Sequence, residues 1–233
     1  MMKKINFAIL NFPGSNCERD CFYIVSKILR QNCKIIWHNE FSISKVDCII
    51  VPGGFSYGDY LRTGSIASQS RISNALIKFA DQGGTVIGIC NGFQILTELK
   101  LLPGTLVRNK NLKFICKDIN LKVNTNSRFT NLYNNNEVIR IPIAHAEGNY
   151  YTDKKTLKKL KDNDQIIFSY CNENGDITKE SNPNGSLLNI AGITNKKGNV
   201  IGLMPHPERV SEKVFNNTDG IKFFKSVVNY HNY

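Results

Sequence analysis

Several residue types and patterns are scarce in this sequence, and each absence excludes a class of protein. The chain has 233 residues, with one tryptophan, 7 prolines and 17 glycines, and 41% of its residues are hydrophobic. This composition excludes a collagen, a long coiled coil and a wholly disordered chain. The length suits a core of one α/β domain or two small ones.

Long apolar runs are also missing. No stretch approaches the length of a membrane-spanning helix. The apolar residues near the start form a brief run interrupted by Asn6 and Asn11, and no small-residue cleavage site follows. We therefore expect a first buried strand rather than a signal peptide, and a cytoplasmic protein with no membrane partner.

Paired cysteine motifs and phosphate-binding loops are absent too. The seven cysteines are an odd number without two CxxC clusters, which argues against a disulfide framework. Cys17 and Cys21 could bind a metal only with further ligands that the sequence does not group nearby. No GxxxxGK[ST] pattern occurs. We expect neither a metal nor a nucleotide cofactor in this chain.

Acidic residues are few relative to basic ones. Lys and Arg number 30 against 19 Asp and Glu, a formal net charge of +11. Such a charge suggests a nucleic-acid or anionic-membrane partner, but a nucleic-acid surface also needs aromatic residues among the basic ones. The basic stretch 154–161 has only leucines and one threonine between its lysines, and is typical of a solvated helix. A narrower hypothesis is that the charge steers docking onto an acidic protein partner.

Apolar runs of strand length alternate with helical patterns in the first hundred residues. This order predicts βαβ units and an open, flavodoxin-like parallel sheet with helices on both faces. The expected strands are 5–12, 34–37, 47–51, 85–89 and 200–204, and the expected helices are 17–31, 65–81, 92–99 and 220–230.

The pattern changes after residue 101, where strands follow one another without long helices between them. The expected strands here are 114–123, 138–143, 165–171 and 187–193, with a loop at 124–136. They predict a smaller antiparallel extension of the same α/β fold. No linker separates two domains, so we expect one domain over residues 1–233.

The sharpest chemical signal is the run from Thr85 to Gln94, TVIGICNGFQ. A buried strand leads into Gly-Ile-Cys-Asn-Gly and then a helix, as in a nucleophile elbow. Gly88 and Gly92 provide the small residues that such a tight turn needs. The pattern predicts Cys90 as a nucleophile at a helix N-terminus, ahead of the alternative of a buried structural cysteine.

A cysteine nucleophile needs a base, and His206 directly follows the last predicted strand. The carboxyl ends of parallel strands share one edge of a sheet, so His206 should lie near Cys90. Glu208 could accept a hydrogen bond from the second imidazole nitrogen and orient the ring. Each residue alone could be an ordinary loop residue; together they predict a Cys90–His206–Glu208 triad.

Acyl transfer also places negative charge on an oxygen. Backbone N–H groups of Gly53 and Gly54, with that of Asn91, could face this oxyanion; the alternative is an ordinary glycine turn. Gln94 shares the helix face of Cys90 and could bind a carboxamide, or could be a surface residue.

These motifs resemble the class I glutamine amidotransferases, and specifically the glutaminase subunits of phosphoribosylformylglycinamidine synthase. The resemblance spans nearly the whole chain, and it rests on segments 11–20, 52–62, 145–148, 182–186 and 202–209. It implies that Cys90, His206 and Glu208 hydrolyse glutamine to glutamate and ammonia, with Gly53, Gly54 and Asn91 at the oxyanion.

The resemblance further implies partners. Ammonia would pass to a large synthetase subunit that uses ATP and magnesium to make formylglycinamidine ribonucleotide in purine synthesis, with a small subunit bridging the two. His145 is a candidate for contact with glutamine or with a partner, or a structural loop residue. A free-standing cysteine hydrolase of the same fold, such as a γ-glutamyl hydrolase, remains an alternative, as does, more remotely, a nucleic-acid-binding protein.

Overall fold

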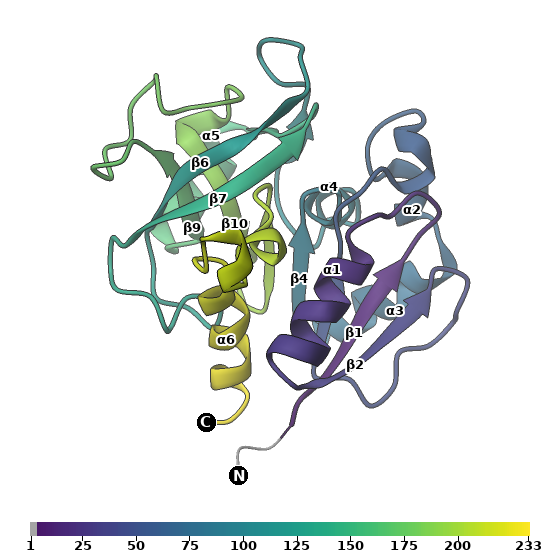
Figure 1. The fold of residues 1–233 in the computed structure, drawn as a ribbon. Coiled ribbons are helices and arrows are strands. Elements are labelled where there is room, and N and C mark those ends of the chain that lie inside the picture. The colour runs from purple at the N-terminus through teal and green to yellow at the C-terminus, as the bar shows by residue number, and fades with distance from the viewer. Residues whose placement is uncertain (1–3) are drawn as a thin grey trace.

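The protein is built around one large twisted sheet (Figure 1). The computed structural model describes residues 4–233, without the side chain of Phe215. Nine strands follow the order β2-β1-β3-β4-β11-β10-β9-β6-β7, and β5 and β8 form a separate two-stranded sheet. The strands are β1 Asn6–Asn11, β2 Asn32–Trp37, β3 Cys48–Val51, β4 Thr85–Ile89, β5 Thr105–Val107, β6 Ile115–Val123, β7 Val138–His145, β8 Asn149–Tyr151, β9 Ile166–Cys171, β10 Ile190–Thr194 and β11 Val200–Leu203.

Helices cover both faces of the parallel half of this sheet. In Figure 1, α1 lies in front of β1 and β2, and α3 lies behind them. The α-helices are α1 Glu18–Tyr23, α2 Ser65–Ser68, α3 Arg71–Asp81, α4 Asn91–Glu98, α5 Lys154–Asp162 and α6 Ile221–Tyr230. A π-helical segment, η1 Ile24–Ile28, continues α1, and the 3-10 helices are η2 Ser56–Asp59, η3 Leu187–Asn189, η4 Pro207–Val210 and η5 Lys213–Phe215.

The two halves of the sheet differ in strand direction and in burial. Strands β2, β1, β3, β4 and β11 are parallel, whereas β10, β9, β6 and β7 pair in antiparallel fashion. Every residue of β3, β4 and β11 is buried, as expected of strands covered on both faces. Strands β6 and β7 alternate over much of their length, so one of their faces meets water. The predicted α/β class with an antiparallel extension is confirmed.

Local differences from the predicted elements have local causes. The helix predicted over 65–81 is two helices, because Ser70 has an extended backbone (φ −68°, ψ 158°) that ends one helix and begins the next. The strand predicted from Leu187 begins only at Ile190, because Leu188 and Asn189 adopt positive φ angles. The short pair β5 and β8 was not predicted, since three residues carry too little periodicity.

The fold determines where chemistry can occur. The segments that follow β1, β3, β4 and β11 all leave the same edge of the sheet, because these four strands are parallel neighbours. They contain Cys17, Gly53, Cys90 and His206 respectively. Ligand sites of open α/β sheets lie at this carboxyl edge.

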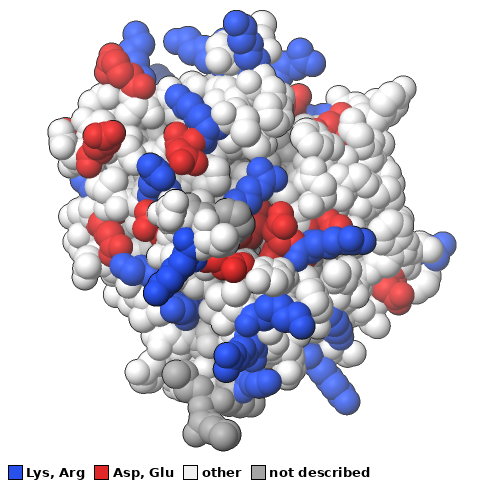
Figure 2. Space-filling view, in the orientation of Figure 1, with Lys and Arg blue, Asp and Glu red and all other residues white. Residues whose placement is uncertain are grey.

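The charge of +11 has no single location on the face in view. Figure 2 shows Lys and Arg side chains scattered over this face, with acidic side chains between them. No helix among residues 4–233 is both long and apolar enough to cross a membrane.

Candidate active site

Cys90 occupies a strained turn between β4 and α4. Its backbone has φ 51° and ψ −106°, a conformation that a non-glycine residue adopts only where its surroundings enforce it. The Cys90 amide donates to the Leu203 carbonyl of β11 at 2.8 Å, which fixes the turn to the neighbouring strand. The side chain is nearly buried, and its thiol lies 3.7 Å from the Ala144 carbonyl.

The two glycines of the predicted elbow are required by close packing. A Cβ on Gly92 would lie 1.9 Å from the Val51 carbonyl oxygen, and one on Gly88 would lie 2.8 Å from the Gly92 backbone. Both contacts are with backbone that cannot move aside. The strand-turn-helix geometry at Cys90 therefore matches the predicted elbow.

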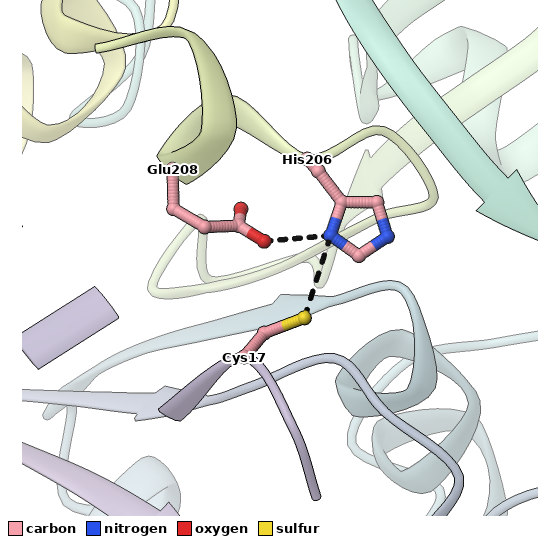
Figure 3. Close-up of side chains that lie close together, drawn as sticks. All are labelled: Cys17, His206 and Glu208. Atoms are coloured by element: carbon pink, nitrogen blue, oxygen red, sulfur yellow. Dashed lines mark hydrogen bonds and ion pairs between the residues drawn. The ribbon is translucent and has the colours of Figure 1, made fainter. Parts of the chain in front are cut away.

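His206 and Glu208 form a buried pair (Figure 3). His206 Nδ1 lies 2.6 Å from Glu208 Oε1, and both side chains are shielded from water. A carboxylate only accepts hydrogen bonds, so Nδ1 carries a proton in either state of the ring. Nε2 offers a lone pair when the ring is neutral and holds a second proton when the ring is charged. Nε2 has no hydrogen-bond partner among the described residues. The imidazole is thus oriented by the carboxylate and keeps one nitrogen free.

The electrostatic surroundings of His206 favour its protonated form. Burial opposes the charge, but Glu208 and then Cys90 favour it, and together they hold the pKa of His206 well above its usual value. The stability contributed by this charge is present at low pH and is lost as pH rises through the raised pKa.

Gly53 lies between the side chains of Cys90 and His206. A Cβ on Gly53 would lie 2.8 Å from His206 Cε1 and 3.5 Å from Cys90 Cβ. The backbone of Gly53 therefore lies against both side chains. The Gly53 carbonyl accepts from the amides of Asn16 and Cys17 at 3.3 and 3.2 Å. In a trans peptide the Gly54 N–H points away from that carbonyl, and no bond from it to a described residue is found.

Asn91 and Gln94 are tied to each other and to the loops around them. Asn91 Nδ2 donates to Gln94 Oε1 at 2.8 Å, and Gln94 Nε2 donates to the Glu147 carbonyl at 2.7 Å. Asn91 Oδ1 accepts from the Ser56 amide at 3.2 Å. Gln94 is 5% exposed, so it is not the surface residue that the sequence left open. Both ends of the Gln94 amide are already hydrogen-bonded within the protein. Oε1 can still accept one more hydrogen bond, and Nε2 can still donate one more.

His145 lies at the end of β7 with one nitrogen unpartnered. Asn109 Nδ2 donates to the His145 carbonyl, which fixes the orientation of the Asn109 amide. Asn109 Oδ1 then accepts from His145 Nδ1 at 3.1 Å and from the Gly148 amide at 3.0 Å. His145 Nε2 is buried without a partner among the described residues. Burial and then the charge of His206 lower the pKa of His145 to about 4, so its ring is neutral near pH 7.

Cys17 is a second thiol beside His206, and it was not predicted from the sequence to lie in the site. Its Sγ lies 3.9 Å from His206 Nδ1, on the side of Glu208 (Figure 3). Arg209 Nη2 donates to this sulfur at 3.2 Å. A signal existed in the sequence: Cys17 follows the first strand of the parallel sheet, and so belongs to the same edge as Cys90. Asn109, which supports His145, gave no comparable signal.

Cys17, His206 and Glu208 also form a group of potential metal ligands, with donor atoms within 4.8 Å of one another. A tetrahedral Zn²⁺ holds nitrogen and oxygen ligands at about 2.0–2.2 Å, which separates them by roughly 3.3 Å. The 2.6 Å contact between His206 and Glu208 is too short for a shared metal ion. The geometry fits a hydrogen-bonded acid–base pair.

Asp59, the last residue of η2, lies beside Asn91 and has a raised pKa. Its Oδ1 accepts from Asn91 Nδ2 at 3.5 Å. Partial burial, and secondly the charge of Glu147, raise its pKa to about 6. Because the folded state holds this proton more tightly than the unfolded chain, the contribution of Asp59 to stability falls as pH rises from about 4 to about 6.

We therefore expect Asp59→Asn to raise the melting temperature more at pH 8 than at pH 4, since the neutral amide removes this unfavourable ionisation. Thermal unfolding at the two pH values measures the difference. Asp81→Asn, at the exposed end of α3, is the matched control. An equal effect of Asp59→Asn at both pH values would contradict the assignment.

Comparisons with known proteins agree with this geometry. The family described as a CobB/CobQ-like glutamine amidotransferase domain matches residues 4–231. A protein of Acaryochloris marina, named phosphoribosylformylglycinamidine synthase subunit PurQ, is 52% identical over 226 residues, covering 97% of this chain and 96% of the relative. A protein of Aquifex aeolicus with the same name is 49% identical over 225 residues, covering 96% of this chain and 99% of the relative.

Solved structures give the same result. A chain in the structure of PurLQS from Thermotoga maritima superposes with a TM-score of 0.86 at 40% identity, covering 98% of this chain and 100% of that one. A glutamine amidotransferase of Thermotoga maritima shares the fold at 15% identity, with a TM-score of 0.57 and coverage of 88% of this chain and 77% of that one.

Proposed function

The chain belongs to the family of PurQ subunits of phosphoribosylformylglycinamidine synthase, within the CobB/CobQ-like glutamine amidotransferases, and from this membership we propose how its residues act. The chain is a glutaminase subunit that releases ammonia from glutamine for purine biosynthesis. Cys90 is the nucleophile, His206 the proton carrier and Glu208 the residue that orients the imidazole. The observation that carries this assignment is the free Nε2 of His206, on a ring that packs with Cys90 around Gly53.

The reaction proceeds in two stages. The Cys90 sulfur attacks the carboxamide carbon of glutamine, and the carbonyl oxygen becomes an oxyanion. His206 then gives a proton to the nitrogen, the C–N bond breaks and ammonia leaves, with a thioester remaining on Cys90. Water next attacks the thioester carbon while His206 accepts its proton, and glutamate departs as the thiolate is restored.

Backbone amides stabilise the oxyanion in this proposal. The amides of Gly53, Gly54 and Asn91 lie on the turns that flank Cys90. The Gly53 carbonyl accepts from the amides of Asn16 and Cys17, and these two bonds fix the orientation of the peptide that contains the Gly54 amide. Gln94 and His145 are proposed substrate contacts. The neutral His145 presents Nε2 as a hydrogen-bond acceptor, which suits an N–H group of the substrate.

We place the chain, as one domain, in a cytoplasmic complex where a small bridging subunit joins it to a large synthetase subunit. PurLQS of Thermotoga maritima supports these partners. ATP and magnesium act on the large subunit, where ammonia converts formylglycinamide ribonucleotide to its amidine, and this chain contributes no cofactor site of its own.

Glutaminase turnover tests the proposal, measured for the chain alone and after mixing with the large and small subunits. We expect turnover to rise on assembly, because an ammonia donor is useful only when an acceptor is in place. Full activity of the isolated chain, unchanged by the partners, would instead favour a free-standing hydrolase of the same fold.

A further inference from the structure

Cys17 contacts the backbone of the turn that follows β3. Its amide donates to the Gly53 carbonyl at 3.2 Å, beside the bond from Asn16. Its Sγ would lie 3.1 Å from a Cβ on Gly53, so the thiol packs directly against the Gly53 α-carbon. Cys17 is therefore fixed to the same turn that supplies the proposed oxyanion amides.

The same sulfur reaches the acid–base pair. It lies 3.9 Å from His206 Nδ1, the nitrogen that donates to Glu208, and Cys17 is fully buried. The sulfur also has two further hydrogen-bond partners. The thiol donates to Asn16 Oδ1 at 3.1 Å, and the sulfur accepts from Arg209 Nη2 at 3.2 Å. These two partners fix the sulfur beside the imidazole.

We propose that Cys17 is a positioning residue of the glutaminase reaction, one that joins the oxyanion turn at Gly53 to the His206–Glu208 pair. The proposal rests on the function proposed above. Cys17 is fully buried, so its sulfur is not exposed to a substrate, whereas it is well placed to limit how far the imidazole shifts relative to Gly53. A misplacement of about 1 Å in a catalytic group can cost about 100-fold in rate.

Several charged or titratable groups surround His206 from the elements packed against it. Glu208 and Arg209 belong to its own turn, Cys17 and Asp20 to the start of α1, Cys90 to the elbow, and His145 to the end of β7. Cys17 is one of the groups that favour the protonated imidazole. Its removal should lower the pKa of His206 as well as loosen the ring.

The assembled complex is the material for the test, with glutamine-dependent and ammonia-dependent synthesis measured side by side. In Cys17→Ala we expect kcat with glutamine to fall about 10- to 100-fold, KM for glutamine to change by less than about threefold, and ammonia-dependent synthesis to be unchanged. The limb of the pH–rate profile that reports His206 should move to lower pH. Cys17→Ser, which keeps a donor and an acceptor, should recover most of the rate.

Cys48→Ala is the matched control. Cys48 is as buried as Cys17, but it lies at the start of β3, at the end of the strand away from Gly53. The proposal is overturned if Cys17→Ala keeps the rate and pH profile of Cys48→Ala, or if Cys17→Ser is as inactive as Cys17→Ala. Where Cys17→Ala does not fold, Cys17→Val takes its place. A loss of rate with the His206 limb moved to lower pH supports positioning, and a rate and profile equal to those of Cys48→Ala contradict it. Full activity of Cys90→Ala would instead refute the proposed function itself.

Discussion

Cys90→Ala should abolish glutamine-dependent synthesis while leaving ammonia-dependent synthesis by the complex intact. Without the sulfur no thioester forms, and the remaining oxyanion amides cannot replace a nucleophile. We expect a loss of about 10³-fold or more in kcat with glutamine. Parallel assays with glutamine and with ammonium salt measure the two activities.

The matched control for this prediction is Cys171→Ala. Cys171 is another buried free thiol, on β9 of the antiparallel half. It should retain both activities, apart from an effect on stability. If Cys90→Ala kept its glutamine-dependent rate, or lost both activities while remaining folded and assembled, Cys90 would not be the nucleophile.

Glu208→Gln should be nearly as damaging although it changes little in volume. In the parent protein the carboxylate accepts a hydrogen bond from His206 Nδ1, and Nε2 has no partner among the described residues. A glutamine amide can donate to Nδ1 instead, which moves the ring proton to Nε2 and removes its ability to accept one. The expected loss in glutamine-dependent kcat is about 10²- to 10⁴-fold.

Glu212→Gln is the control for this substitution. Glu212 lies four residues further on and accepts a hydrogen bond from the Tyr23 hydroxyl at 3.4 Å, outside the triad. Its variant should keep the glutamine-dependent rate within about twofold of the parent. A Glu208→Gln enzyme with a similarly small loss would show that the imidazole is oriented by other groups, and the role of Glu208 would have to be withdrawn.

Much of the site could be predicted because its members follow strand ends. Cys90 directly follows β4 and His206 lies three residues after the end of β11, and these two strands are parallel neighbours in the sheet. Continuous apolar runs predict such strands, and parallel strands place their carboxyl ends together. Gly88 and Gly92 could be recognised in the sequence as the small residues that a tight turn at Cys90 requires.

The remaining features depend on contacts that no local pattern encodes. Cys17 reaches His206 only because the loop after β1 folds over Gly53 through the amides of Asn16 and Cys17. The bond from Gln94 to the Glu147 carbonyl likewise joins residues that are 53 positions apart in the sequence. Helix breaks such as that at Ser70 depend on a single backbone conformation, which the helical pattern of the flanking residues conceals.

Two buried thiols lie beside one imidazole, so the identity of the nucleophile is the assignment to test. Cys90 lies on the strained elbow, whereas Cys17 is hydrogen-bonded to Asn16 and Arg209. A diazoketone analogue of glutamine alkylates the sulfur that attacks the substrate, and peptide mass spectrometry locates the label. We expect one label per chain, on the peptide that contains Cys90, and none on Cys17. A label on Cys17, or equal labelling of the Cys90→Ala variant, would contradict it.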